Sequence, residues 1–306
     1  GLPYASQHAG RMHACGHDGH TTMLLAAAKQ IAEHGRFSGT LNLIFQPAEE
    51  FGTCHSGAVR MLEDGLFDKY PCDAIFAMHN MPGHPQGQLL FRDGAMMASS
   101  DKVRIVLHGR GGHGGVPHKA ADPVVAAASL VMALQTVVSR NVDPQQTAVV
   151  TVGVLQAGHA NNVIPQSAEL ELSVRTLDSA VRKRLKQRIV NLAHAHAQSF
   201  ELTAEVDYQR GYAVLVNTGP ETELARQVGV ELVGADKVVA QGPALTGSED
   251  FAFMLERCPG SYLLIGNGDG DSAGACMVHN PGYDFNDDNL AIGAAYWTLL
   301  ARRFLV

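Results

Sequence analysis

The stretch DKVRIVLHGRGGHGG, residues 101–115, divides the chain into two kinds of sequence. Its first part alternates polar and apolar side chains, which is typical of a half-exposed strand, and a glycine-rich loop follows. Further alternating or helical segments come after it, at 122–140, 147–158, 167–178, 179–198 and 201–209. Together with the first strand they give the order β-α-β-β-α-β, which predicts a small antiparallel sheet covered by two helices.

The sequence on either side of this block has a different pattern. Continuous apolar runs at 39–45, 73–79 and 261–266 are of the kind found in buried strands. Helices are expected at 18–34, 54–65, 220–233, 248–257 and 287–304, and a further strand near 87–93. We therefore expect an α/β fold, in which a discontinuous domain of residues 1–97 and 213–306 carries an inserted α+β domain, residues 98–212.

Composition excludes several classes of protein. Hydrophobic residues make up 46% of the 306 and charged residues 17%, which predicts a large core. The net charge of −7 and the lack of a basic run argue against a nucleic-acid partner. No signal-peptide pattern and no continuous apolar run of the ~18 residues that span a membrane is visible. Five scattered cysteines indicate reduced thiols, hence a cytoplasmic protein. The lack of a membrane-length apolar run argues against a membrane partner.

Residue types that bind metals recur after the expected strands and in glycine-rich loops. They are Cys15 and His17 in HACGHD, Glu49 and Glu50 after the run 39–45, His79 after the run 73–78, and His279 in a loop after 261–266. The carboxyl ends of strands in a parallel α/β sheet line one crevice, so these segments can converge. A mixed set of thiolate, imidazole and carboxylate suits a borderline divalent ion, or a pair of them.

The adjacent glutamates can divide the work of a hydrolase. We assign Glu50 to the metal and Glu49 to the general base that takes a proton from a metal-bound water. Each signal has a simpler interpretation when taken alone: HACGHD as a helix-capping loop, and the two glutamates as a solvated turn. His13 and His20 are interpreted as residues that pack or hydrogen-bond beside the ligands. Only the joint placement favours a metal site.

The glycine-rich loop does not have the spacing of a nucleotide-binding motif. Its His113 stands among glycines with little side-chain cover. Two interpretations stay open from the residues: a histidine that reaches outward to a ligand, or an ordinary surface histidine.

Eight motifs give the chain a family resemblance. They are MHACGHDGHT, FQPAEE, AMHN, GRGGHGGVPH, NNVIP, SVRTLD, GSEDF and HNPGYDFND, and they run from residue 12 to residue 287. With them the chain resembles the M20 metallopeptidases, in particular the amidohydrolase branch with hippurate hydrolases, N-acyl-L-amino-acid amidohydrolases and auxin-conjugate hydrolases. The resemblance implies a catalytic α/β domain of the phosphorylase/hydrolase-like, zinc-exopeptidase type. It also implies that the inserted domain is a ferredoxin-like lid and dimerisation domain.

The resemblance implies a cofactor, a reaction and roles for single residues. Two divalent ions per subunit, whether manganese, zinc, cobalt or nickel, would serve the hydrolysis of N-acyl amino acids of the hippurate or N-acetyl type. Their ligands would be Cys15, His17, Glu50, His79 and His279, with Glu49 as general base. His113 would reach the substrate carbonyl from the partner subunit of a homodimer formed through 98–212. Asn162 and Arg175 would hold the substrate carboxylate.

Two alternatives accompany this interpretation. One is a related dipeptidase or aminoacylase-type exopeptidase, which would share the chemistry but act on other substrates. The other is a non-catalytic binding relative. Members of the family carry a substantial segment before MHACGHD, which begins here at residue 12, so the first strands of the catalytic sheet are expected to be absent.

Overall fold

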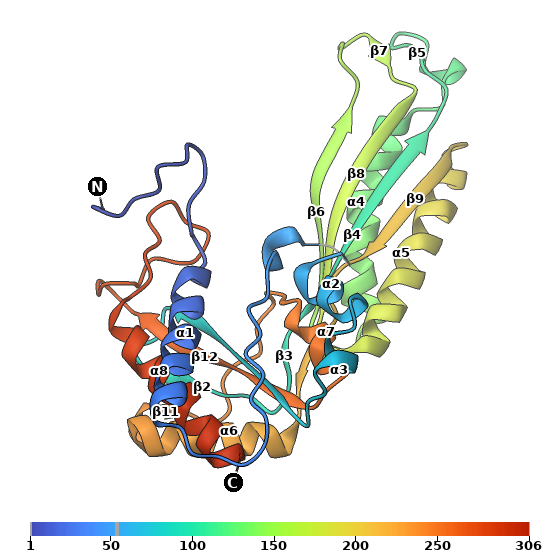
Figure 1. The fold of residues 1–306 in the computed structure, drawn as a ribbon. Helices are drawn as coiled ribbons and strands as arrows, with labels where there is room; N and C mark the ends of the chain where they lie inside the picture. Colours follow the sequence, from blue (N-terminus) through green and yellow to red (C-terminus); the bar gives the residue numbers. More distant parts are fainter. Residues whose placement is uncertain (1, 53–54, 306) are drawn as a thin grey trace.

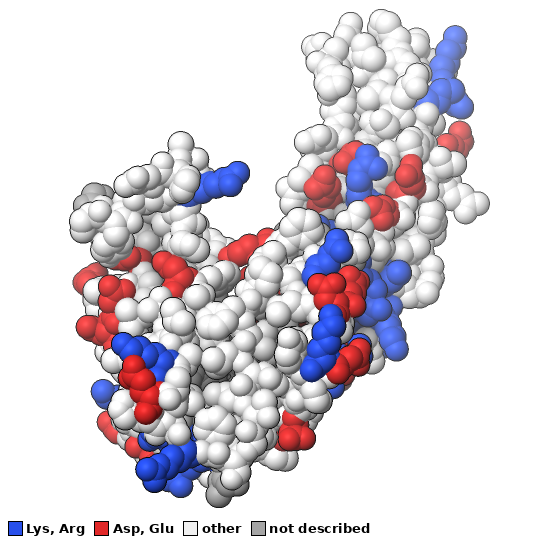
Figure 2. All heavy atoms as spheres, viewed as in Figure 1, with Lys and Arg blue, Asp and Glu red and all other residues white. Residues whose placement is uncertain are grey.

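The computed structural model of the chain describes residues 2–52 and 55–305. A projecting lobe, residues 99–210, rises from a core built by the remaining described residues (Figure 1). The chain enters the lobe after strand β3 (Gly94–Met97) and returns through β10 (Leu215–Asn217), and these two strands pair antiparallel. Figure 2 shows a hollow between core and lobe on the same face, with acidic side chains along its floor.

The core is built on a four-stranded sheet in the order β1-β12-β2-β11. Its strands are β1 (Ile75–Pro82), β12 (Gly260–Gly268), β2 (Leu89–Leu90) and β11 (Val238–Val239). The two long strands, β1 and β12, run parallel, as their continuous apolar sequences predict. All nine residues of β12 are buried, because helices cover the sheet on both sides.

The two faces of the core sheet carry different helices. One cluster packs Leu263 and Ile265 of β12 against helices on one face, and a second packs Tyr262 and Leu264 against helices on the other. The first face is covered by α1 (His17–His34), α6 (Gly219–Val233) and α8 (Asp288–Phe304). The second is covered by α2 (Gly57–Glu63), α3 (Leu66–Lys69) and α7 (Phe251–Leu255). The alternation of β12 side chains thus joins three layers into one core.

The projecting lobe is an antiparallel sheet with helices on one side. The sheet has the order β6-β8-β4-β9, from strands β6 (Ala148–Ala157), β8 (Ser167–Thr176), β4 (Ser99–His108) and β9 (Thr203–Arg210). Helices α4 (Pro123–Asn141) and α5 (Ser179–Ser199) pack on it through a shared apolar cluster. The mixed α/β fold is therefore confirmed, whereas the domain limits at 98 and 212 stay a prediction.

The outer end of the lobe carries a second small pairing. Strands β5 (Gly112–His113) and β7 (Val163–Ile164) pair antiparallel there, beside a 3-10 turn, Pro117–Lys119. This tip lies at the far end of the lobe from the core (Figure 1). The glycine-rich loop is therefore an element of the tip rather than of the core.

Three expected core strands differ from the observed ones. Residues 39–48 form no strand, because a strand needs a hydrogen-bonded neighbour and no described residue pairs with this segment. A cavity of about 900 Å³ is lined both by this segment and by β1. The strand at 73–79 is shifted, so that His79 lies inside β1 rather than after it, and the strand near 87–93 shrinks to two residues.

Helix α4 is long and apolar enough to cross a membrane when judged by length and composition, with a mean hydropathy of 1.4. Its residues Ala126, Leu130 and Leu134 are buried in the apolar cluster of the lobe. A core helix passes the same test, so α4 is weak evidence of a membrane span. At the root of the lobe, Arg182 of α5 and Asp101 of β4 form a buried ion pair.

Candidate metal centre

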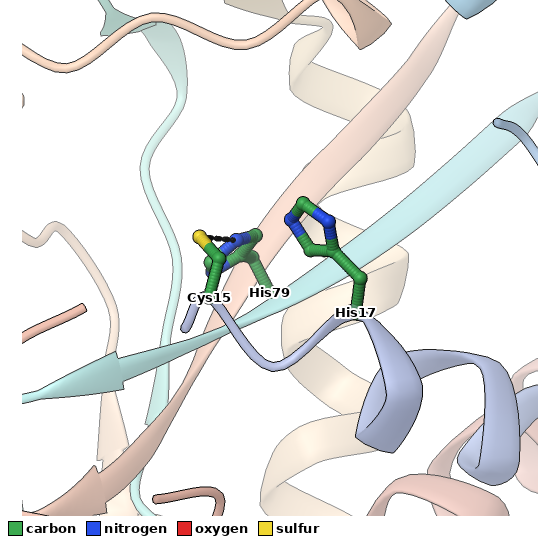
Figure 3. A group of neighbouring side chains, drawn as sticks. All are labelled: Cys15, His17 and His79. Carbon is green, nitrogen blue, oxygen red and sulfur yellow. Dashed lines mark hydrogen bonds between the residues drawn. The ribbon is translucent and has the colours of Figure 1, made fainter. Parts of the chain in front are cut away.

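The centre begins at the turn that leads into α1. Gly16 has φ 88 and ψ 13, a left-handed conformation that favours glycine, and α1 starts at the next residue. Cys15 and His17 lie at the two ends of this turn, and their side chains rise from it in the same direction (Figure 3). The left-handed turn therefore presents a thiol and an imidazole to the same space.

His79 of β1 completes the first group of ligand atoms. Its Nε2 lies 3.4 Å from Sγ of Cys15, and its Nδ1 lies 2.6 Å from the carbonyl oxygen of Asn80. A carbonyl oxygen only accepts hydrogen bonds, so Nδ1 carries the proton. The Nε2 atom consequently keeps its lone pair, which is the form of histidine that binds metals.

Glu50 and His279 form a second group on the open side of the centre. Oε1 of Glu50 lies 3.0 Å from Nε2 of His279, and both side chains are more than half exposed. Two ligands of a tetrahedral ion with bonds of about 2.0–2.1 Å lie roughly 3.3 Å apart, so both pairs have the spacing of neighbouring ligands. His279 has φ 66, a conformation that costs a non-glycine residue about 1–3 kcal/mol and is common at functional sites.

The ligand atoms form overlapping sets within 4.8 Å of one another. One set is Cys15, His17 and His79; another is Cys15, Glu50 and His279; a third is His17, Glu49 and Glu50. Cys15, His17 and Glu50 each belong to two of these three sets. The donors and their spacing therefore fit one or two borderline divalent cations.

Burial prepares the imidazoles of the centre for metal binding. It lowers the pKa of His79 to about 4 and lowers the pKa of His17 below its usual value. Both rings are therefore neutral at pH 7, as a ligand requires. Burial and the charge of Glu50 raise the pKa of Cys15, so the bare thiol holds its proton until a cation replaces it.

Glu49 lies beside the ligands in a 3-10 turn, Glu49–Phe51, in which Glu49 is half-buried and the other two residues are exposed. Burial, helped by the charges of Asp250 and Glu50, raises its pKa to about 8. Carboxyl oxygens of Glu49, Glu249 and Asp250 all lie within 4.8 Å of one another. Glu49 is therefore a carboxyl group that can take and give a proton near neutral pH.

Two features of the Glu49 turn were missed by sequence reasoning. Glu249 and Asp250 are buried, and only the motif GSEDF could have drawn attention to them. Asp250 accepts hydrogen bonds from Gln46 and from the backbone of Ala58, and so anchors the segment before the turn. The hydroxyl of Tyr212, in contact with the same turn, donates to the carbonyl of Glu49 and accepts from N–H of Gly52 at 2.8 Å.

The expected substrate-binding residues do not join the ligands within one chain. His113 and Asn162 are exposed and lie at the tip of the lobe, remote from the start of α1 (Figure 1). Arg175 of β8 is nearer the core, and its Nη1 donates to the carbonyl of Thr246 at 2.9 Å. His20 accepts a hydrogen bond from N–H of Asn80 at 2.9 Å, which confirms its predicted place beside the ligands.

The sequence profile of peptidase family M20/M25/M40 matches residues 1–303. The chain belongs to this family. A hippurate hydrolase of Campylobacter jejuni is 44% identical over 304 residues, which cover 99% of this chain and 77% of the relative. An N-acetyl-L-cysteine deacetylase of Bacillus subtilis is 40% identical over 298 residues, 97% of this chain and 68% of the relative.

A solved structure of this M20 family has the same fold. It is a dinuclear metal-binding peptidase from Bacillus subtilis, 30% identical, with a TM-score of 0.82 over 99% of this chain and 76% of its own. The family therefore includes a protein with two metal ions at this fold, and the overlapping ligand sets around Cys15 fit the same number.

Proposed function

We propose that the chain is a metal-dependent amidohydrolase that splits the amide bond of N-acyl amino acids, with hippurate and N-acetyl amino acids as representative substrates. The observation that carries this proposal is the meeting of Cys15, His79 and His279 from three distant segments beside Glu49 and Glu50. The hippurate hydrolase and deacetylase names of the similar proteins support the same reaction class.

The roles of the residues follow from their places. Cys15, His17, Glu50, His79 and His279 would hold two divalent ions. Bound ions of this kind act as Lewis acids and lower the pKa of a coordinated water to about 7. Glu49 takes the proton of the attacking water and returns it to the departing amine, a role that suits its raised pKa. Manganese, zinc, cobalt and nickel all suit the donor set.

The first test is hydrolysis of hippurate by the purified chain. Chelation should abolish turnover, and returning each metal separately should show which ion restores it. Glu49→Gln should lower kcat by about 10²–10⁴, the usual contribution of a general base. The matched control is Glu63→Gln, which changes an exposed carboxyl group on α2 and should leave kcat unchanged. Unchanged turnover in Glu49→Gln would refute the proposal, and a preference for dipeptides over acyl amino acids would favour an exopeptidase.

We propose that His113 and Asn162 act in the centre of a second copy of the chain. The distance between the tip of the lobe and the ligands in one chain supports this (Figure 1). N–H of Gly115 donates to Nδ1 of His113 at 2.9 Å, so the proton of the neutral ring sits on Nε2. That N–H can donate to the oxyanion that forms on the substrate carbonyl, an interaction worth about 10²–10³ in rate.

The surface of the lobe supports a homodimer. Strand β6 is an edge of the lobe sheet, and its Leu155 is 50% exposed. On the neighbouring helix α4, Val125 is 55% and Met132 is 70% exposed. No strand of the described residues pairs with the outer edge of β6, and such an edge, like the exposed apolar side chains of α4, is a surface that a second copy can cover.

Mixing two inactive variants tests both the dimer and the role of His113. Glu49→Gln removes the base from its own centre, and His113→Ala removes the donor from the partner's centre. Random exchange makes about half of the dimers mixed, and each mixed dimer holds one complete centre, so activity should recover to about a quarter of wild type. If His113 acted within its own chain, the mixture would stay inactive.

Arg175 is proposed to hold the substrate carboxylate. The carbonyl of Thr246 takes one of its five N–H donors, and the rest of the fork can bind a carboxylate. Arg175→Lys should raise KM for acyl amino acids more than it lowers kcat. We also propose a cytoplasmic location, because Cys15, Cys72, Cys258 and Cys276 are free thiols, which suits a reducing compartment.

A further inference from the structure

Asn80, the residue after His79, is fully buried and uses all its polar groups. Its backbone N–H donates to Nε2 of His20 at 2.9 Å, and its carbonyl accepts from Nδ1 of His79 at 2.6 Å. Its side-chain Nδ2 donates to the carbonyl of Cys15 at 2.6 Å, and its Oδ1 accepts from the hydroxyl of Tyr283 at 2.9 Å. One side chain thus joins the Cys15 turn, β1 and the loop that carries His279.

We propose that Asn80 and Tyr283 are positioning residues which set the geometry of the metal ligands and thereby the affinity for the ions. The inference rests on the metal centre of the proposed function, although neither residue is a ligand. We call the chain of hydrogen bonds from Tyr283 through Asn80 to Cys15 the clasp.

The direction of each hydrogen bond in the clasp is determined. Oδ1 of an amide accepts only, so the hydroxyl of Tyr283 must donate to it. The flip of the Asn80 amide is fixed by the carbonyl of Cys15, which only accepts and therefore requires Nδ2 toward it, so that Oδ1 faces the hydroxyl of Tyr283. Without the hydroxyl, the buried Oδ1 of Asn80 loses its donor, and the amide that donates to the Cys15 carbonyl is no longer held from the side of Tyr283.

The clasp also ties the two ligand groups together. The loop of residues 276–283 contacts the Cys15 turn a second time, because N–H of His279 donates to the carbonyl of Ala14 at 2.6 Å. Cys15 lies within ligand distance of His17 and His79 on one side and of Glu50 and His279 on the other. Two attachments, one at His279 and one at Tyr283, therefore hold the loop at a constant distance from the turn.

Packing leaves the clasp little freedom. Tyr283 is 3% exposed, and a Cβ atom added to Gly16 would collide with both the amide of Asn80 and the hydroxyl of Tyr283. The groups therefore meet with no space for an intervening water or another side chain. A rigid second layer of this kind keeps the ligands near the geometry that the ion needs.

The test compares two tyrosines that each lose one hydroxyl. Tyr283→Phe removes the first donor of the clasp, whereas Tyr296→Phe removes a buried hydroxyl that donates to the carbonyl of Ala225, away from the ligands. Dissociation constants for Zn²⁺ and Mn²⁺ are measured by chelator competition, without substrate. Tyr283→Phe should weaken metal binding by about 10- to 100-fold, the usual effect of losing a hydrogen-bond partner of a ligand, and Tyr296→Phe by less than about twofold.

Activity supplies the second measurement. At metal concentrations above the new dissociation constant, Tyr283→Phe should recover kcat with an unchanged KM. Asn80→Ala should weaken metal binding at least as much, and adding Tyr283→Phe to it should cost nothing further, because the two residues act in series. This pair of variants keeps the test decisive if one alone expresses poorly.

Two results would overturn the clasp: metal affinity in Tyr283→Phe within twofold of wild type, or an equal loss in both tyrosine variants, which would indicate a general loss of stability. The proposed function fails separately. A wild-type chain that binds metal but does not hydrolyse acyl amino acids would refute the activity, while the metal affinities of the tyrosine variants would still judge the clasp.

Discussion

Gly16 is the position at which one added methyl group should disturb the metal centre most. Its backbone has φ 88, and an added Cβ would meet the amide of Asn80 and the hydroxyl of Tyr283 inside van der Waals contact. Gly16→Ala therefore combines backbone strain with displacement of two buried polar groups. Neither neighbour can move without breaking a hydrogen bond of the clasp.

The loss in free energy of unfolding caused by Gly16→Ala follows from these two effects. The left-handed conformation costs an L-residue about 1–2 kcal/mol relative to glycine. Losing the hydrogen bonds from Tyr283 to Asn80 and from Asn80 to Cys15 costs about 1 kcal/mol each. The free energy of unfolding of the metal-free protein should fall by about 3–4 kcal/mol, a large part of the 5–15 kcal/mol typical of a folded protein.

The assay is urea unfolding of the metal-free protein, followed by metal titration. The control is Gly153→Ala, because Gly153 lies in β6 with no atom within 4 Å of an added Cβ. That variant should keep its stability within about 0.5 kcal/mol. If Gly16→Ala unfolded within about 1 kcal/mol of wild type and bound metal equally well, the turn would not be as tightly constrained as its contacts indicate.

Three further predictions concern the lobe and the thiols. Arg182→Ala should lower stability by about 3–5 kcal/mol because it leaves the buried carboxylate of Asp101 without its cation, whereas Arg104→Ala, which breaks an exposed pair with Glu169, should cost at most about 1 kcal/mol; similar melting temperatures would contradict this. Burial raises the pKa of Cys258 to about 11, so thiolate is scarce below that pH, and alkylation at Cys258 should accelerate as pH rises from 8 to 10 and lag behind the partly exposed Cys276 at pH 8; equal rates at pH 8 would contradict this. Because the bare Cys15 thiol holds its proton, its labelling is compared at pH 10, where bound Zn²⁺ should slow alkylation of Cys15 relative to the chelated protein, as mass spectrometry of the labelled peptide would show, while labelling of Cys276 stays unchanged; measurable and equal labelling of Cys15 in both states would argue against a thiolate ligand.

The order and type of most elements were predictable from the sequence. Periodicity near 3.6 in α4 and α5 and alternation in β4, β6 and β8 reflect local burial patterns that each segment carries by itself. The ligand residue types were visible for the same reason, since thiols, imidazoles and paired carboxylates in glycine-rich loops are local signals. Buried strand β12 was recognisable from its continuous apolar sequence.

Other features depended on partners far away in the chain. The apolar run 39–45 looks like a strand, but strand formation needs a neighbour, and no described residue supplies one. His79 lies within β1 because pairing with β12 continues to Pro82, beyond the point where the apolar pattern ends. Both differences arise because hydrogen bonds between strands are decided by the neighbouring segment rather than by the strand's own residues.

Chemistry in the centre was decided in the same way. The raised pKa of Glu49 comes first from its burial and then from the charge of Asp250, some two hundred positions away. The protonation of His79 at Nδ1 requires the adjacent carbonyl to point at the ring. Sequence determined which groups the chain possesses and which local structures hold them. Tertiary structure alone decided which groups meet, because Coulomb forces and hydrogen bonds depend on separations in space that residue order does not specify.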